Sequence, residues 1–190
     1  MSKTIWKPGS MLYPAPVVMV SCGDFENKKD MNIITVMYAG SACRDPHMLQ
    51  ISVRTDRYSY GIIKKYGEFV VNLTTEKLAF ATDFCGVKSG KDIDKFAETG
   101  LSAAKSEKVG APSILESPIN IECRVAQIIE AGSHHIFLGE VLCVGADDQY
   151  LDEKGKFHLE KAKPICYSHG KYYGMGECFG GFGFSVRKKK

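Results

Sequence analysis

The chain has 190 residues, of which 44% are hydrophobic and 25% are charged, and its formal net charge is +3. These values are ordinary for a globular protein and exclude a chain that is disordered throughout. The length predicts a single domain over residues 1–190 with a substantial core. A basic tail at 187–190 carries part of the charge, and we interpret it as solvated rather than as a nucleic-acid arm.

The start of the chain lacks the apolar segment of a signal peptide, and the longest apolar run, 15–20, is too short to span a membrane. Seven cysteines are widely spaced and form no CxxC pair, which disfavours a disulfide framework and a zinc ribbon. We therefore predict a cytoplasmic protein with free thiols and no metal site.

Strand-like segments dominate the first third of the chain. Residues with β-branched and aromatic side chains predict strands over 17–21, 32–39, 48–54 and 68–73. Between the last two strands, apolar residues at helical spacing predict a helix that begins near 59, runs to 66 and is ended by Gly67.

The middle of the chain predicts helices. Thr75 can cap a helix over 76–84 that Gly86 ends, and 92–98 can form a short further helix. The second half returns to strands over 119–130 and 135–145, joined by a hairpin turn, and a polar turn follows at 152–155. Helices grouped between runs of strands, without βαβ alternation, predict a closed β-barrel decorated by helices.

Arginines and hydroxyl groups gather where the strand over 48–54 gives way to the following helix. The residues concerned are Ser52, Arg54, Arg57 and Ser59. A helix N-terminus presents unpaired N–H groups and the positive end of the dipole, so this corner favours a phosphate group. The alternative is that the two arginines lie on the surface and pair with Asp45 or Asp56.

Small residues at 39–43 follow the strand over 32–39 and precede a turn at Asp45-Pro46. They would let a flat ligand lie against the backbone, whose N–H groups could bond to a heterocycle. The alternative is a tight connection between strands that needs no bulky side chain.

Three motifs carry a resemblance to a known family: N-x-x-T-V at 32–36, S-V-R-x-x-R-x-S at 52–59 and S-G-x-D-x-D-K-F at 89–96. From about residue 14 to the C-terminus, the chain resembles the flavin reductase-like FMN-binding split barrels, and among them flavoredoxin. The resemblance implies a mainly β fold with helices, built on a six-stranded Greek-key barrel that binds FMN and works as a homodimer.

The resemblance also implies which residues contact FMN. The first motif and the residues after it would line the isoalloxazine ring or its edge, through Asn32, Thr35, Val36, Met37, Tyr38, Ala39, Ser41, Ala42 and Cys43. The second motif would hold the ribityl chain and phosphate through Ser52, Val53, Arg54 and Ser59, and Asp94, Lys95 and Phe96 would close the far side. Relatives often have tryptophan where Tyr38 stands, which leaves the role of this residue open.

The function implied is NAD(P)H-dependent reduction of flavin or of ferric or other acceptors, by hydride transfer to flavin N5. No catalytic side chain is needed, because the flavin carries the chemistry. The main alternative is a flavoredoxin-type electron carrier that a protein partner reduces, without nicotinamide activity. A pyridoxamine-phosphate-oxidase-like enzyme and a cofactor-free nucleic-acid binder are further alternatives.

Two residues lead to specific expectations. Arg54→Ala should weaken FMN binding by about 1.5–3 kcal/mol, the scale of a charge-assisted hydrogen bond. Lys95, if it lies near the flavin pyrimidine, should stabilise the anionic reduced flavin; a solvated helix lysine is the alternative.

The glycine-rich segment near the C-terminus is not a dinucleotide-binding motif, and its Phe179, Phe182 and Phe184 are available to pack on a partner subunit.

Overall fold

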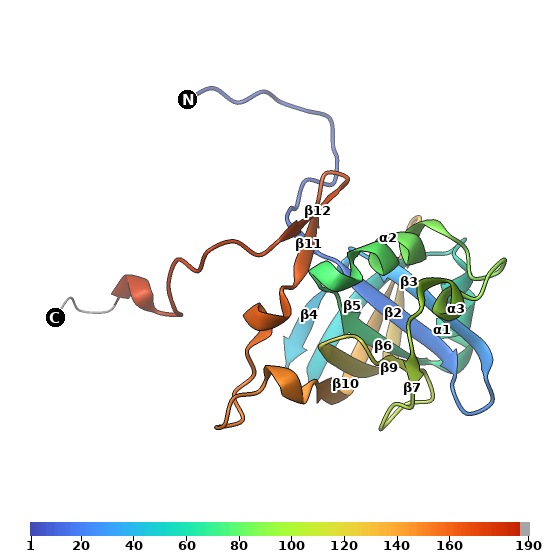
Figure 1. Ribbon diagram of the computed structural model, residues 1–190. Coiled ribbons are helices and arrows are strands. Elements are labelled where there is room, and N and C mark those ends of the chain that lie inside the picture. The colour runs from blue at the N-terminus through green and yellow to red at the C-terminus, as the bar shows by residue number, and fades with distance from the viewer. Residues whose placement is uncertain (187–190) are drawn as a thin grey trace.

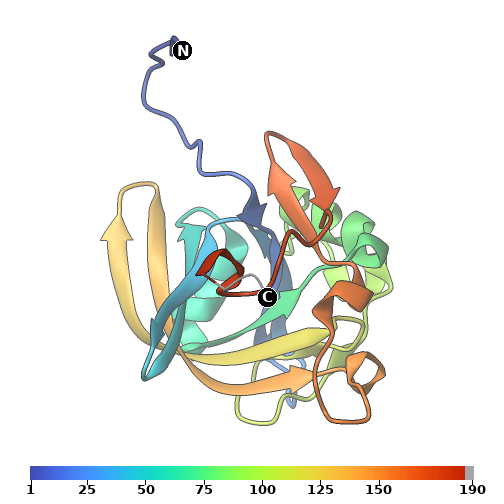
Figure 2. The same cartoon turned by 90° about the vertical axis from the view of Figure 1, so that its left-hand side faces the viewer.

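The computed structural model describes residues 1–186, so the basic tail at 187–190 lies outside the described residues. Its centre is one antiparallel sheet with the strand order β3-β2-β6-β9-β10-β5-β4. The strands are β2 (Val18–Asp24), β3 (Lys29–Val36), β4 (Ala39–Arg44), β5 (His47–Arg54), β6 (Glu68–Leu73), β9 (Ile119–Ala131) and β10 (His134–Ala146). Figure 2 shows the long β9–β10 hairpin curling around the other strands.

Alternation of inward and outward side chains gives this sheet its interior. Along β5, Leu49, Ile51 and Val53 are buried while their neighbours are not, and they pack with Phe69 and Phe137 in the main core. Gly139 is required beside Phe69, because a Cβ at this position would lie 2.7 Å from the phenyl Cζ atom. Register shifts in the β9–β10 pairing mark bulges, which bend strands.

In residues 1–186, the α-helices that pack against the sheet are α1 (Tyr58–Tyr66), α2 (Ala79–Val87) and α3 (Lys95–Thr99). Gly67 ends α1 with φ 68°, and its N–H bonds to the Ile63 carbonyl at 2.8 Å. Asp94 caps α3 by accepting from the N–H groups of Phe96 and Ala97. A second core joins α2 and α3 to β2 and β3, so these helices cover one face of the sheet (Figure 1).

The remaining elements are short. A three-stranded sheet has the order β1 (Ala15–Pro16), β11 (Ile165–Ser168), β12 (Lys171–Gly174), and β7 (Ala103–Ala104) pairs with β8 (Ser113–Ile114). The 3₁₀ turns of the described part of the chain are η1 (Glu76–Leu78), η2 (Asp148–Tyr150), η3 (Leu159–Ala162) and η4 (Phe184–Val186). Both ends of the described chain extend away from the body, the N-terminal segment upward and the C-terminal segment to the left in Figure 1.

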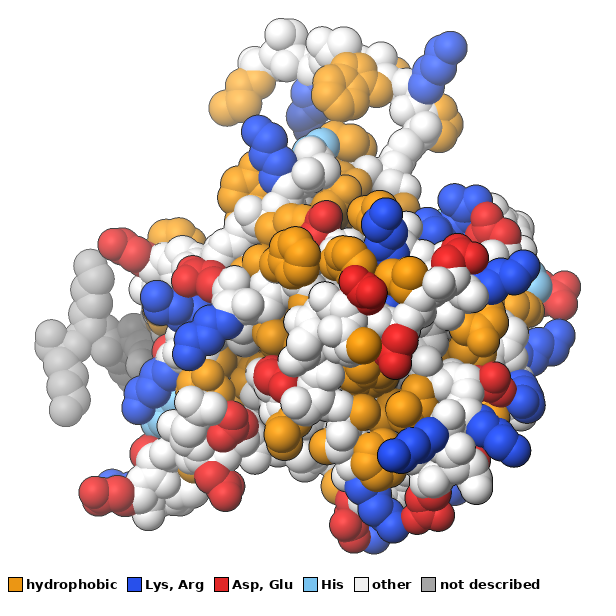
Figure 3. Space-filling model, turned by 45° about the vertical axis from the view of Figure 1, so that its right-hand side comes forward, with side chains coloured by type: hydrophobic (Ala, Val, Ile, Leu, Met, Phe, Trp, Pro, Cys, Tyr) orange, Lys and Arg blue, Asp and Glu red, His pale blue; other side chains and the backbone are white. Residues whose placement is uncertain are grey.

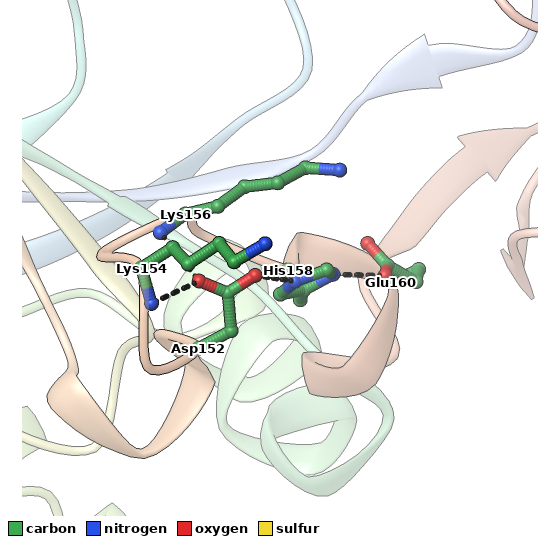
Figure 4. Close-up of polar contacts among 5 residues, drawn as sticks. All are labelled: Asp152, Lys154, Lys156, His158 and Glu160. Atoms are coloured by element: carbon green, nitrogen blue, oxygen red, sulfur yellow. Dashed lines mark hydrogen bonds and ion pairs between the residues drawn. The ribbon is translucent and has the colours of Figure 1, made fainter.

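The predicted polar turn at 152–155 forms, and an ion-pair cluster holds the loop around it. Figure 4 shows His158 between two carboxylates: its Nε2 atom lies 2.9 Å from Asp152 and its Nδ1 atom 2.9 Å from Glu160. These carboxylates raise the pKa of His158, and the bonds that Asp152 accepts from His158 and nearby backbone N–H groups lower the pKa of Asp152 to about 2. The cluster therefore ties η3 to the preceding turn.

The surface of the body carries charges of both signs. On the face in Figure 3, acidic and basic side chains are interspersed rather than gathered by sign. Among residues 1–186, no helix is long and apolar enough to cross a membrane.

The observed elements differ from the predicted ones at several points. Gly86 does not end its helix but lies inside α2, where a Cβ would come within 3.2 Å of Thr35 Cβ, so it allows α2 to approach β3. The helix predicted over 92–98 begins only at Lys95, because Asp94 caps it. The small residues at 39–43, interpreted either as a surface for a flat ligand or as a tight connection, form the edge strand β4.

Candidate functional site

A small polar cavity of about 190 Å³ lies where β3, the start of α1 and the loop after α2 meet. Its lining includes Asn32 from β3, Arg57 and Ser59 from the start of α1, and Lys88, Ser89 and Gly90 from the loop. A cavity of this size is below the roughly 300–1,000 Å³ of sites that take a whole small molecule. It suits one polar group of a larger ligand.

One hydrogen bond joins two of these elements. The Asn32 amide nitrogen donates to the Ser59 hydroxyl at 2.7 Å, and both side chains are buried. The loop after α2 also packs against Asn32, through Gly90. A Cβ at position 90 would lie 1.9 Å from the Asn32 amide oxygen, which is too close for any side chain. The loop therefore reaches the strand at this depth only with glycine at position 90.

A buried ammonium group also lines the small cavity. Lys95 is only 4% exposed, and its Nζ atom donates to the carbonyls of Ile33 at 2.6 Å and Cys85 at 2.7 Å. An ammonium group has three donors, so one remains for a ligand. Burial lowers the pKa of Lys95, and the charge of Arg57 lowers it further. An anion in the cavity would relieve both effects.

The small cavity thus has a positive balance of charge. Arg57, Lys88 and Lys95 line it, against one carboxylate, that of Asp56. The first N–H groups of α1 lack partners within the helix and add to the positive potential at Arg57–Ser59. This end of the site favours an anion.

A second, larger cavity of about 1010 Å³ adjoins the far end of β3. Its lining comes from the N-terminal residues 9–16, from Met37–Ala39 and Ala42, from Gln50 and Ser52 on β5, and from Ile129, Ile136 and Leu138 on the β9–β10 hairpin. None of the described residues that line it is charged. It suits a flat, largely apolar group.

Tyr38 stands between the N-terminal segment and the sheet at this cavity. Its hydroxyl donates to Ser10 at 3.1 Å, and its ring meets that of His134 edge-on at 5.3 Å. The backbone carbonyl of Tyr38 accepts from the Ser52 N–H at 2.8 Å, which fixes the cavity floor to β5.

The structure brings eight of the predicted site residues to these two cavities. The small cavity takes Asn32, Ser59 and Lys95, and the large cavity takes Met37, Tyr38, Ala39, Ala42 and Ser52. Lys95 is thus buried, not a solvated helix lysine.

The other predicted residues lie elsewhere. Val36, Val53 and Phe96 are in the hydrophobic cores, Thr35 donates to the Thr82 carbonyl, and Asp94 caps α3. Ser41 and Cys43 line a separate hollow of about 260 Å³ beside β5. The Arg54 side chain is 50% exposed and pairs with Asp56 at 2.6 Å, the surface pairing that the sequence left open.

The prediction of site residues missed several that line the cavities. Lys88, Ser89 and Gly90 belong to this group, although Ser89 and Gly90 begin the third sequence motif and so carried a signal. Arg57 was part of the predicted corner but not of the expected FMN contacts. Residues 9–16 carry no local pattern that distinguishes a cavity wall from an ordinary N-terminal segment.

Comparison with known proteins shows the family and the fold of the chain. The family model for the flavin reductase like domain matches residues 10–176. Flavoredoxin of Desulfovibrio vulgaris (Miyazaki F) superposes with a TM-score of 0.89 at 28% identity, covering 98% of this chain and 100% of that one. Flavoredoxin from Methanosarcina acetivorans gives 0.87 at 26% identity, with the same coverage.

A relative with a named role is the reductase subunit HsaB of a flavin-dependent monooxygenase from Mycobacterium tuberculosis. It is 28% identical over 138 residues, which is 73% of this chain and 65% of that protein. The split-barrel fold expected from the sequence is confirmed by the solved structures. The chain belongs to the flavin reductase-like domain family, and its role is flavin-related electron transfer.

Proposed function

We propose that the chain binds FMN across the two cavities, with the phosphate in the small one and the isoalloxazine ring against Met37–Ala39 in the large one. The observation that carries this proposal is the contrast between the cavities. One is small, cationic and bordered by the N-terminus of α1, and the other is large and lined by uncharged side chains. FMN has the same two ends, a dianionic phosphate and a flat ring system.

Arg57, Lys88 and the free donor of Lys95 are the proposed phosphate ligands, together with Ser59. This assignment takes Arg57 in place of Arg54, because Arg54 lines neither cavity and its guanidinium is already paired with Asp56. Gly90 supports the same assignment, since its missing side chain lets the loop close over Asn32.

FMN, when bound, accepts a hydride at N5 and releases electrons singly or in pairs. The chain's own part is to orient and shelter the ring: Met37 and Tyr38 line the cavity beside it, and Ser52 and Gln50 offer hydrogen-bonding groups on its floor. Lys95 would hold a positive charge at the phosphate end of the cofactor, through the Nζ donor that the Ile33 and Cys85 carbonyls leave free.

We propose that the donor is NADH or NADPH and that the acceptor is free flavin, ferric iron or another small molecule. The size of the large cavity supports this, because about 1010 Å³ leaves room for a second planar molecule beside the ring. The similarity to a monooxygenase reductase subunit supports it as well. The second candidate is an FMN electron carrier reduced by a protein partner, which the likeness to two flavoredoxins favours. In either role we propose that the chain works as a homodimer.

An absorption experiment tests these proposals. The purified protein is incubated with FMN, desalted, and mixed without oxygen with NADH and, separately, with NADPH. Retained flavin bands that bleach with either nucleotide support the reductase. Retained bands that bleach only with dithionite support the carrier. Loss of all flavin on desalting, with no binding in a fluorescence titration, contradicts both.

A further inference from the structure

The last described segment, residues 175–186, forms an arm that leaves the body after β12 (Figures 1 and 2). Its large apolar side chains are in solvent: Met175 is 66% exposed, Phe179 95% and Val186 84%. The arm nevertheless has a local fold, because the Phe184 N–H bonds to the Gly181 carbonyl at 3.0 Å and the Phe184 ring lies against Gly180. A run of exposed apolar residues with a defined backbone marks a binding surface.

The large cavity described above offers a matching surface. It is lined by uncharged side chains, and between 175 and 186 the arm has one charged residue, Glu177. The arm's own residues do not contribute to the lining of the cavity in their own chain. Met175, Phe179 and Phe184 therefore keep 66%, 95% and 58% of their surface exposed unless another molecule covers them.

The arm and the cavity lie on one side of the molecule. The arm starts at the end of β12, which belongs to the same small sheet as β1, and Ala15 and Pro16 of β1 line the cavity. A twofold axis through this side would bring each arm to the cavity of the other chain. The same contact would then form twice, so the arms and the cavities of both copies would be covered.

We propose that the arm of each chain seats Phe179 and Phe184 in the large cavity of a second copy. The occupant of the cavity mouth is therefore a second copy of this chain. The inference rests on the proposed homodimer and names the segment that joins it. It also means that the ring end of the flavin site is completed by an aromatic side chain of the partner.

The area available is sufficient for a stable dimer. Scaled by exposures of 95% and 58%, Phe179 and Phe184 would bury about 230–380 Å² for one arm. Two arms contribute about 460–760 Å², and the cavity walls that they cover bury a comparable area, so the total of about 900–1,500 Å² reaches the roughly 1,000 Å² expected of a specific interface. The cavity of about 1010 Å³ is larger than two phenyl groups, so room remains for a planar ligand.

Photo-crosslinking tests where the arm lies. Phe179 is replaced by p-benzoylphenylalanine, and light and ¹⁵N-labelled chains are mixed in urea and refolded so that hybrid dimers form. We expect crosslinks between a light and a heavy chain, from position 179 to peptides that contain residues 9–16 or 37–42. Crosslinks within one chain, crosslinks to another surface of the partner, or none at all would overturn the proposal.

Sedimentation equilibrium tests whether the arm holds the dimer. The double variant Phe179→Ser, Phe184→Ser should weaken dimerisation by about 30-fold or more, the effect of losing an interface hot spot. The matched control is Phe80→Ser, since Phe80 is an exposed phenylalanine that belongs to α2 and not to the arm. Equal dimer affinity of the double variant and the control would contradict the proposal. Both experiments are run without flavin and again with FMN, so failure of flavin binding leaves the result on the arm interpretable.

Discussion

Gly90→Ala is the substitution that most sharply tests the architecture of the small cavity. A Cβ at this position would lie 1.9 Å from the Asn32 amide oxygen and 2.5 Å from its Cγ atom. Either the Asn32 side chain must leave its place or the loop at 88–90 must move outward. In both cases the bond from Asn32 to Ser59 or the closure of the cavity is lost.

The expected change in the free energy of unfolding has three contributions. Breaking the buried Asn32–Ser59 bond costs about 1–3 kcal/mol when its partners stay unsatisfied. Overpacking costs about 1–3 kcal/mol, and the lower entropy of alanine in the unfolded chain offsets about 0.4–1 kcal/mol. We therefore expect the free energy of unfolding to fall by about 1–6 kcal/mol. FMN affinity should fall by at least about tenfold, the effect of losing one hydrogen bond to a charged group.

Urea unfolding followed by circular dichroism measures the first effect, and a flavin fluorescence titration the second. The matched control is Gly61→Ala in α1, where a Cβ would meet nothing within 4 Å. This control should stabilise the protein by about 0.5–1 kcal/mol through helix propensity and leave FMN binding unchanged. If Gly90→Ala matches the control in both measurements, the close contact between the loop and Asn32 does not exist in solution.

Three further predictions concern ionisable groups. Lys95→Met removes the donor to the Ile33 and Cys85 carbonyls together with a proposed phosphate ligand, so the thermal midpoint should fall and FMN affinity should drop by about tenfold or more. Unchanged FMN affinity would show that the lysine does not contact the phosphate. Because the pKa of His158 is raised, the stability from its ion pairs is complete below pH 6.5 and is lost as pH rises through the raised value. The pKa of Asp152 is lowered, so the stability from its carboxylate is complete above pH 3.8 and is lost as pH falls toward 2. An NMR titration should therefore place the His158 midpoint above 6.5, Asp152→Asn should lower it, and an identical midpoint in both proteins would contradict the cluster. Exposed Cys43 and Cys178 should react with a thiol reagent at pH 8 within minutes, while Cys22 and Cys123, whose pKa burial raises to about 12, should react only on unfolding; labelling of the latter pair in the native state would refute their burial.

The sequence predicted the framework of the fold well, because the framework depends on local signals. The strand at 68–73 and the end of the first helix at Gly67 were predicted at their observed positions, since alternation and a glycine C-cap act over a few residues. The edge strand β4 was not predicted, because its small and polar residues have low strand propensity and pair only when β5 lies beside them.

The site was predicted in part for a related reason. Asn32 and Ser59 were found through their motifs, which reflect a direct contact between two elements. Arg54 and Arg57 are three positions apart and look equivalent in the sequence. Their different environments, a surface pair with Asp56 and the lining of a cavity, depend on how the turn before α1 is oriented. No local pattern encodes that orientation.

The central claim is that the phosphate of FMN occupies the small cavity beside Arg57. The most direct test measures the affinities of FMN and riboflavin for the natural chain, Arg57→Ala and Arg54→Ala. We expect Arg57→Ala to lose about 10–100-fold in FMN affinity with riboflavin affinity unchanged, the effect of one charge-assisted bond. Arg54→Ala should change FMN affinity by less than about threefold, as for an exposed ion pair. A loss of FMN affinity in Arg54→Ala but not in Arg57→Ala, or equal losses for FMN and riboflavin, would contradict the account.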